Sequence, residues 1–354
     1  MWQYQYNDMQ MHTISKGKWK VILTTVTFGA LAILIFAIRS QIWETILNLG
    51  RVNALALLTM LVWQGLNYHS YAKLYQYYFR ILGERIRYRP MLRVTLELNF
   101  INNVFPSGGV SSFSYFGLRM KDADVPGSKS ALVQLAKFLT VFVSFQILLA
   151  IGLFLLAVEG KANSVTILVA GSLATLLLVA TFALAFIIGS KTRINSFFTV
   201  IARVINRIIH VFRRRHPETI NVARVRDMFT QLHENYLLLK SDLHALRKPF
   251  WWSFIANVSE VLTIYSVYVA FGQYVNPGAV ILAYAVANFA GLISVLPGGV
   301  GIYEALMTAV LAAAGVNPAL SIPVTIMYRI LNMTIQLPPG YYFYHKNLHR
   351  KHLA

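Results

Sequence analysis

The chain has 354 residues, of which 56% are hydrophobic and 13% are charged, about half the charged share of an average soluble domain. Its 32 Lys and Arg residues against 13 Asp and Glu residues give a formal net charge of +19 at pH 7. Long apolar stretches recur, so the composition excludes an ordinary soluble domain and predicts an all-α integral membrane protein. The lack of cysteine excludes disulfides and thiolate metal sites. Basic loops at a membrane surface explain the charge better than binding of nucleic acid does.

Six apolar segments are long enough to cross a bilayer as helices, because about 20 residues rising roughly 1.5 Å each cover the hydrocarbon core. These segments are residues 19–38, 52–72, 130–158, 163–189, 250–272 and 320–344. The first follows Lys16, Lys18 and Lys20 and lacks a small-residue cleavage site. We therefore expect a retained anchor at this position, with residues 1–18 in the cytoplasm.

Two further apolar segments are interrupted in the middle. Residues 91–118 are broken at Pro106-Ser107-Gly108-Gly109, and residues 278–316 are broken at Pro297-Gly298-Gly299-Val300-Gly301. The arms of the first segment are too short to span a bilayer on their own. Short helical arms around a Pro-Gly break predict re-entrant hairpins, which are tolerated at membrane depth where protein or a water-filled cavity surrounds the broken backbone.

The distribution of basic residues predicts the orientation of these elements. Residues 73–93, residues 190–249 and the C-terminus are rich in Lys and Arg, whereas the connections at 39–51, 159–163 and 273–277 carry few charges. Basic segments stay in the cytoplasm, so both termini are expected there, in a multi-pass protein of the cell (inner) membrane. The first hairpin then enters from the cytoplasm and the second from outside. Two full crossings in place of either hairpin would satisfy the same charge pattern.

The two interrupted segments resemble each other. Asn99-Phe100 precedes Pro106 and a Gly-Gly-Val in the first, and Asn288-Phe289 precedes Pro297 and a Gly-Gly-Val in the second. Each segment lies between two predicted spans, within residues 52–158 and residues 250–344, and the charge pattern gives the two copies opposite orientations. This arrangement predicts an inverted repeat within a single membrane domain, a design that places substrate sites near the midplane. Close helix packing also requires glycine and is the alternative explanation of the two breaks.

The largest soluble part is expected to be residues 190–249, as cytoplasmic amphipathic helices. Apolar residues repeat at spacings of three and four from Val222 to Leu246, which is a heptad stripe. Packing of this stripe within the chain is one interpretation, and a homodimer or partner contact through residues 222–246 is the other.

Ionisable side chains inside apolar segments are costly and therefore mark functional sites. They are Glu97, Lys137, Glu260, Glu304 and Arg329, with Arg119 at the end of a hairpin arm. Pairing of Arg329 with Glu304 or Glu260 is one expectation, and binding of a zwitterionic or cationic lipid head group by part of this set is the other. The nine His residues show no metal-ligand spacing, so neither a metal nor another cofactor is expected.

The stretch from Ser294 to Glu304, which reads SVLPGGVGIYE, and the later pair Tyr328-Arg329 resemble the transmembrane region family of lysylphosphatidylglycerol synthases, a flippase-like domain. The resemblance implies a membrane domain that moves aminoacylated or other phospholipids between leaflets. It places functional weight on Pro297, Gly298, Gly299, Gly301, Glu304 and Arg329. The first break lacks the Gly-Glu and Arg that many members carry. The chain also ends without the aminoacyl-transfer domain, so that chemistry is not expected of it.

The sequence therefore predicts a lipid transporter with its head-group site between the helix breaks and with no catalytic residues. An integral-membrane transferase and a scaffold for a partner enzyme are the alternatives. The expected ligands are phospholipids or lipid-linked substrates, with the basic segments against the anionic membrane surface. The candidate substrate-binding residues are Pro297, Gly298, Gly299, Gly301, Glu304, Arg329, Glu260, Lys137, Asn288, Asn99, Pro106, Gly108, Gly109 and Arg119.

Overall fold

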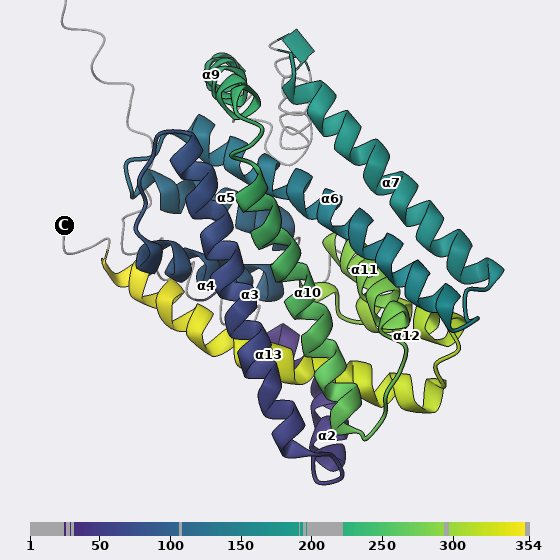
Figure 1. Cartoon of the computed structure of the whole chain (residues 1–354). Helices are drawn as coiled ribbons and strands as arrows, with labels where there is room; N and C mark the ends of the chain where they lie inside the picture. Colours follow the sequence, from purple (N-terminus) through teal and green to yellow (C-terminus); the bar gives the residue numbers. More distant parts are fainter. Residues whose placement is uncertain are drawn as a thin grey trace, which may run out of the picture.

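The structure is a computed structural model that describes residues 32–105, 108–190, 222–293 and 297–350, together with five isolated positions between 25 and 196. All regular elements in this described part are helices (Figure 1), which confirms the predicted all-α class. In chain order, they are α2 (Arg39–Leu49), α3 (Ala54–Ile81), α4 (Tyr88–Val104), α5 (Gly108–Lys121), α6 (Gly127–Val158), α7 (Ser164–Ile188), α9 (Val222–Ser241), α10 (Arg247–Ala270), α11 (Pro277–Ile293), the 3₁₀ turn η1 (Pro297–Gly299), α12 (Ile302–Ala313) and α13 (Pro318–Arg350).

Among the described residues, three helices combine the length and apolarity needed to cross a membrane. They are α6, α7 and α10. The number of predicted spans is larger because α3 and α13 are long but carry polar side chains along their length, among them Gln64 on α3 and Gln336 on α13. Both of these glutamines are buried against other helices. The predicted span 19–38 lies mostly outside the described residues.

Residues 39–51, expected as a connection, form the helix α2 over most of their length. The helix packs against α13, because Ile42 and the preceding Ile38 share a core cluster with Ile330 and Met333 of that helix. Ile38 and Thr45 are buried, whereas Trp43 on the other side is exposed. Residues 39–51 therefore contribute a packed helix, which the small number of charges in this stretch did not predict.

The helices α3 and α10 pack against each other along their length and run in opposite directions. The backbone N–H of Asn53 donates to the carbonyl of Ala270 at one end, and Asn67 Nδ2 donates to the carbonyl of Ala256 further along. Between these contacts, the hydroxyls of Thr59 and Ser266 are 2.8 Å apart. In the view of Figure 1, this pair of helices runs across the middle of the molecule.

Each interrupted segment consists of two helices that pack on each other, α4 with α5 and α11 with α12. The segments also pack across the molecule, since α4 lies against α13 and α11 lies against α6. Exchanging the halves 52–158 and 250–344 thus turns one set of contacts into the other. Very close backbone approach occurs in both, at Gly278 against Gly152 and at Gly340 against Leu96.

The described part of the stripe, from Leu232 onward, packs within the chain, where α9 contacts α6. Leu232 and Leu239 are buried, and Tyr236 packs against the same core. His233 Nδ1 lies 3.0 Å from the carbonyl oxygen of Ile188 at the end of α7. Leu243, by contrast, is 67% exposed. Most of the described stripe therefore has an intramolecular partner, with Leu243 as the exception. Residues 197–221 lie outside the described part, as do the side chains of 222–230.

Candidate functional site

A polar cavity of about 240 Å³ lies where the two helix breaks meet. Gly109 from the first break and Gly298 and Gly299 from the second all line it. Its wall also includes polar side chains from helices distant in the sequence. Among them are Asn67, Asn99, Asn103, Gln134, Lys137, Glu260, Asn288, Arg329, Asn332 and Gln336. The two breaks are therefore opposite parts of one site.

The second break is a turn built from glycine. Gly298 and Gly299 have φ of 60° and 66°, a left-handed conformation that other residues rarely adopt. A Cβ on Gly298 would lie 3.3 Å from the carbonyl oxygen of Asn103 at the end of α4 and 3.1 Å from Met333 Cε on α13. The turn therefore presses against the first half of the chain, and its sequence is restricted by both backbone conformation and space.

Glu304 and Arg329 stabilise this turn through hydrogen bonds to each other and to its backbone. Arg329 Nε donates to Glu304 Oε1 at 3.0 Å, and the other carboxylate oxygen accepts from the backbone N–H of Gly301 at 2.7 Å. The Arg329 guanidinium also donates to the carbonyl of Gly298 and lies over the Tyr303 ring, 4.4 Å from its centroid. The expected pairing of Arg329 thus falls on Glu304 and not on Glu260. Arg329 lines the cavity, and Glu304 holds it in place.

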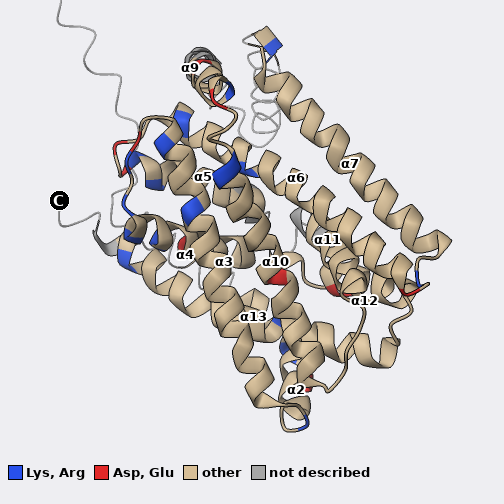
Figure 2. Ribbon diagram, in the orientation of Figure 1, with Lys and Arg blue, Asp and Glu red and all other residues tan. Residues whose placement is uncertain are grey.

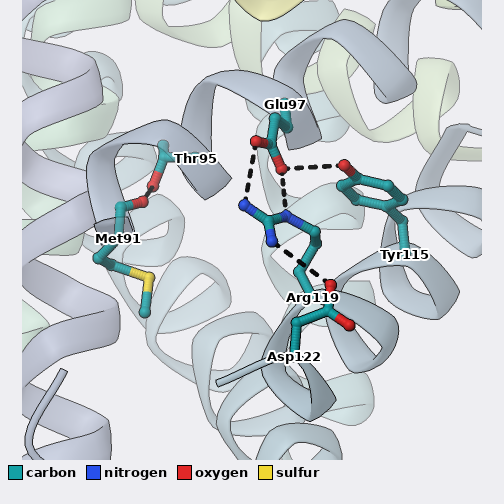
Figure 3. Close-up of polar contacts among 6 residues, drawn as sticks. All are labelled: Met91, Thr95, Glu97, Tyr115, Arg119 and Asp122. Carbon is teal, nitrogen blue, oxygen red and sulfur yellow. Dashed lines mark hydrogen bonds and ion pairs between the residues drawn. The ribbon is translucent and has the colours of Figure 1, made fainter. Parts of the chain in front are cut away.

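The first half has an ion pair of its own, shown in Figure 3. Arg119 on α5 donates to both oxygens of Glu97 on α4, from Nε at 2.6 Å and from Nη2 at 3.2 Å. Tyr115 donates to the same carboxylate at 2.9 Å, and Asp122 lies 3.5 Å from Arg119 Nη1. Arg119 is absent from the residues that line the cavity. The pair instead ties the two arms of the first interrupted segment together.

Glu260 on α10 is a buried carboxylate at the cavity wall, held by neutral donors. It accepts hydrogen bonds from Tyr328 OH at 2.6 Å, Gln64 Nε2 at 2.9 Å and Asn332 Nδ2 at 3.0 Å. Gln336 extends the network to the first half, because its amide bonds Gln64 and its oxygen accepts from Asn103 at 3.0 Å. This network links α3, α4, α10 and α13 around the cavity.

Lys137 on α6 lines the cavity from the opposite half of the chain. Its ammonium lies 5.0 Å from the ring centroid of Tyr71, 5.6 Å from that of Tyr75 and 5.8 Å from that of Phe138. Within the described part of the chain, no carboxylate lies within 4.0 Å of it. It therefore differs from Arg119 and Arg329, whose charges are neutralised by direct contact.

The remaining predicted residues fall in three groups. Asn99 and Asn288 line the cavity. Gly108 begins α5, Pro297 begins η1, and Gly301 precedes α12. Of these, Gly301 is not among the described residues that line the cavity. Pro106 lies outside the described residues. Two lining residues, Asn332 and Gln336, were not predicted as site residues, and neither was Gln64, which hydrogen-bonds Glu260 and Gln336. Their signal was present as polar residues inside apolar helices, with Asn332 and Gln336 one helical turn apart on α13.

A polar cavity bounded by two helix breaks and walled by long apolar helices defines a polytopic membrane protein with an internal site. The lysylphosphatidylglycerol synthase TM region family matches residues 19–340, and the chain belongs to this family. A UPF0104 membrane protein of Pyrococcus horikoshii is 24% identical over 247 residues, covering 67% of this chain and 70% of the relative. Two UPF0104 membrane proteins of Methanothermobacter thermautotrophicus are similar over shorter stretches. One is 24% identical over 35% of this chain and 37% of its own length, and the other is 33% identical over 26% and 28%.

Proposed function

We propose that this protein moves phospholipids or other lipid-linked amphiphiles between the leaflets of its membrane. The observation that carries this proposal is the joint cavity, since both helix breaks and buried polar side chains from both halves line one space. A head group needs polar partners while it crosses the hydrocarbon core, and this cavity supplies them. The lipid chains would stay in the bilayer beside the apolar helices.

The contacts between the halves support an inverted repeat with re-entrant hairpins as the framework of this movement. The halves exchange equivalent contacts, and their first helices α3 and α10 run antiparallel. Two arrangements of opposed hairpins would open the cavity to one side or the other. In this proposal, the Glu304–Arg329 pair holds the second hairpin tip in its binding conformation.

The charge distribution supports the proposed orientation in the cell membrane. Figure 2 shows Lys and Arg gathered at the end of the bundle where α4, α5 and α9 lie. Excess Lys and Arg mark the cytoplasmic side of membrane proteins, so we place this end in the cytoplasm. We place both chain termini on this side as well, following the charge pattern of the sequence. The basic end would then lie against the anionic lipids of that surface.

Reconstitution into liposomes tests the proposed movement directly. We expect fluorescent phospholipids to exchange between leaflets several-fold faster with the protein than in empty liposomes, for at least one head group. The measurement is the loss of fluorescence when a membrane-impermeant reductant quenches the outer leaflet. Equal rates with and without protein, across anionic and zwitterionic head groups, would refute lipid movement. A transferase or a scaffold remains the alternative in that case.

A further inference from the structure

We propose that the Lys137 ammonium is the anion-binding group of the cavity and that the phosphate of a lipid head group is its ligand. This inference rests on the proposed function, because it assumes that a head group enters the cavity. It specifies the chemical group that the cavity would bind, a negatively charged phosphate ester. It also names Lys137 as the side chain that would contact this group.

Lys137 differs from the other cations near the cavity because it has no direct counter-ion in the part of the chain that the structure describes. Arg329 is neutralised by Glu304 at 3.0 Å, and Arg119 is neutralised by Glu97 at 2.6 Å outside the cavity wall. Lys137 has no carboxylate within 4.0 Å among the described residues. A charge inside a membrane protein is costly unless it is paired. Lys137 therefore lacks the direct ionic contact that Arg119 and Arg329 have, and an anionic ligand would supply it.

The Lys137 ammonium is surrounded by aromatic rings, which leave its N–H donors available to a ligand. Tyr71, Tyr75 and Phe138 surround it at cation–π distances, which partly compensate its charge when no ligand is bound. Aromatic faces do not accept strong hydrogen bonds, so the three N–H donors of the ammonium can turn to an anionic oxygen. Gln134, one helical turn before Lys137 on α6, lines the same part of the wall. It accepts a hydrogen bond from Tyr75 OH at 3.3 Å.

Glu260, the carboxylate on the same cavity wall, already has hydrogen-bond partners within the protein. It accepts three hydrogen bonds from Tyr328, Gln64 and Asn332. Its oxygens are thus satisfied by neutral donors, whereas the described residues give the Lys137 ammonium aromatic contacts instead. A phosphodiester carries one negative charge, and lysine binds phosphate as a point charge. The amides of Asn67, Asn99 and Asn288 on the wall can complete the contacts to phosphate oxygens.

Binding is the appropriate test, because it does not depend on movement of the lipid. The full chain, purified in non-ionic detergent, would be titrated with dioleoylphosphatidylglycerol, with dioleoylglycerol, which lacks the phosphate, and with soluble glycerol phosphate. Affinity and the ligand-dependent shift in melting temperature are measured for the parent, Lys137→Gln and Lys137→Arg. Lys248→Gln is the matched control, since this exposed lysine also lies over a tyrosine ring, that of Tyr77.

We expect Lys137→Gln to weaken phosphatidylglycerol binding at least about tenfold, as befits the loss of a hydrogen bond to a charged group. Lys137→Arg and Lys248→Gln should bind close to the parent, and dioleoylglycerol should not distinguish the variants. Without lipid, Lys137→Gln should melt no lower than the parent, because an unpaired charge has been removed. Competition by glycerol phosphate would show that phosphate alone suffices, and failure to compete would identify the lipid as the ligand.

The proposal is overturned if Lys137→Gln binds phosphatidylglycerol as the parent does, or if Lys248→Gln weakens it equally. It is also overturned if Lys137→Gln melts well below the parent without lipid, which would indicate a structural role. Normal Lys137-dependent binding without lipid movement in liposomes would instead refute the transport function and leave the binding site standing.

Discussion

Exchange of Arg329 for glutamine is expected to abolish most lipid movement while the chain still inserts into the membrane. The guanidinium holds three parts of the site together, namely Glu304, the carbonyl of Gly298 and the ring of Tyr303. Its loss leaves Glu304 buried without a counter-ion, which costs about 3–5 kcal/mol for a buried pair. Glu304→Gln should act in the same direction, because it removes the anion and one acceptor of the turn. Exchange rates in liposomes and unfolding in detergent measure the two effects.

A double variant and a control pair separate stability from function. Arg329→Gln with Glu304→Gln should recover part of the lost stability, since no uncompensated charge remains, but it should not recover movement. Lys129→Gln removes a partner from the partly exposed Lys129–Glu84 pair at 2.7 Å and should change little. Parent-like lipid movement in Arg329→Gln and in Glu304→Gln would show that the Arg329–Glu304 pair has no role in transport.

Gly278→Ala is expected to destabilise the protein by about 1–3 kcal/mol, the usual cost of overpacking. The added Cβ would lie 2.2 Å from the carbonyl oxygen of Gly152, a backbone atom that cannot rotate away. The helices α11 and α6 would have to separate, and α11 leads into the second break. Melting temperature and exchange rate should therefore fall together.

Gly171→Ala is the matched control for this change, because Gly171 lies on α7 and a methyl group added there would have no atom of a neighbouring element within 4 Å. It should be neutral or slightly stabilising, since alanine favours helix by up to about 1 kcal/mol over glycine. If both alanine variants melt at the same temperature, the close contact between α6 and α11 is not what limits stability.

Much of the framework followed from apolar periodicity and two local breaks. Runs of apolar residues predicted α6, α7 and α10, because a spanning helix records its environment in its own sequence. The Pro-Ser-Gly-Gly and Pro-Gly-Gly sequences predicted two interrupted segments, since glycine and proline mark a break locally. Glu304 and Arg329 were predicted as ionisable residues inside apolar segments, and the family resemblance gave them further weight. The helix α2 was missed because its stability comes from α13, which lies far away in the sequence.

The composition of the cavity wall was harder to predict for the same reason. Gln64 and Glu260 are 196 residues apart, and Asn103 and Gln336 are 233 residues apart, yet each pair is hydrogen-bonded. No local pattern encodes which buried polar groups become partners. Arg119 and Lys137 were both predicted as site residues from their positions in the sequence, but only Lys137 lines the cavity. Only the packing of α4 and α5 separates the paired Arg119 from the cavity.

The central claim is that a lipid head group occupies the space between the two breaks. A density map of the protein in lipid nanodiscs that contain phosphatidylglycerol tests it most directly. We expect a phosphate-sized density in the cavity between Gly109 and Gly298, within hydrogen-bonding distance of Lys137, with acyl chains leading out to the bilayer. A cavity that holds only water, with all ordered lipid on the outer surface of the helices, would contradict the claim.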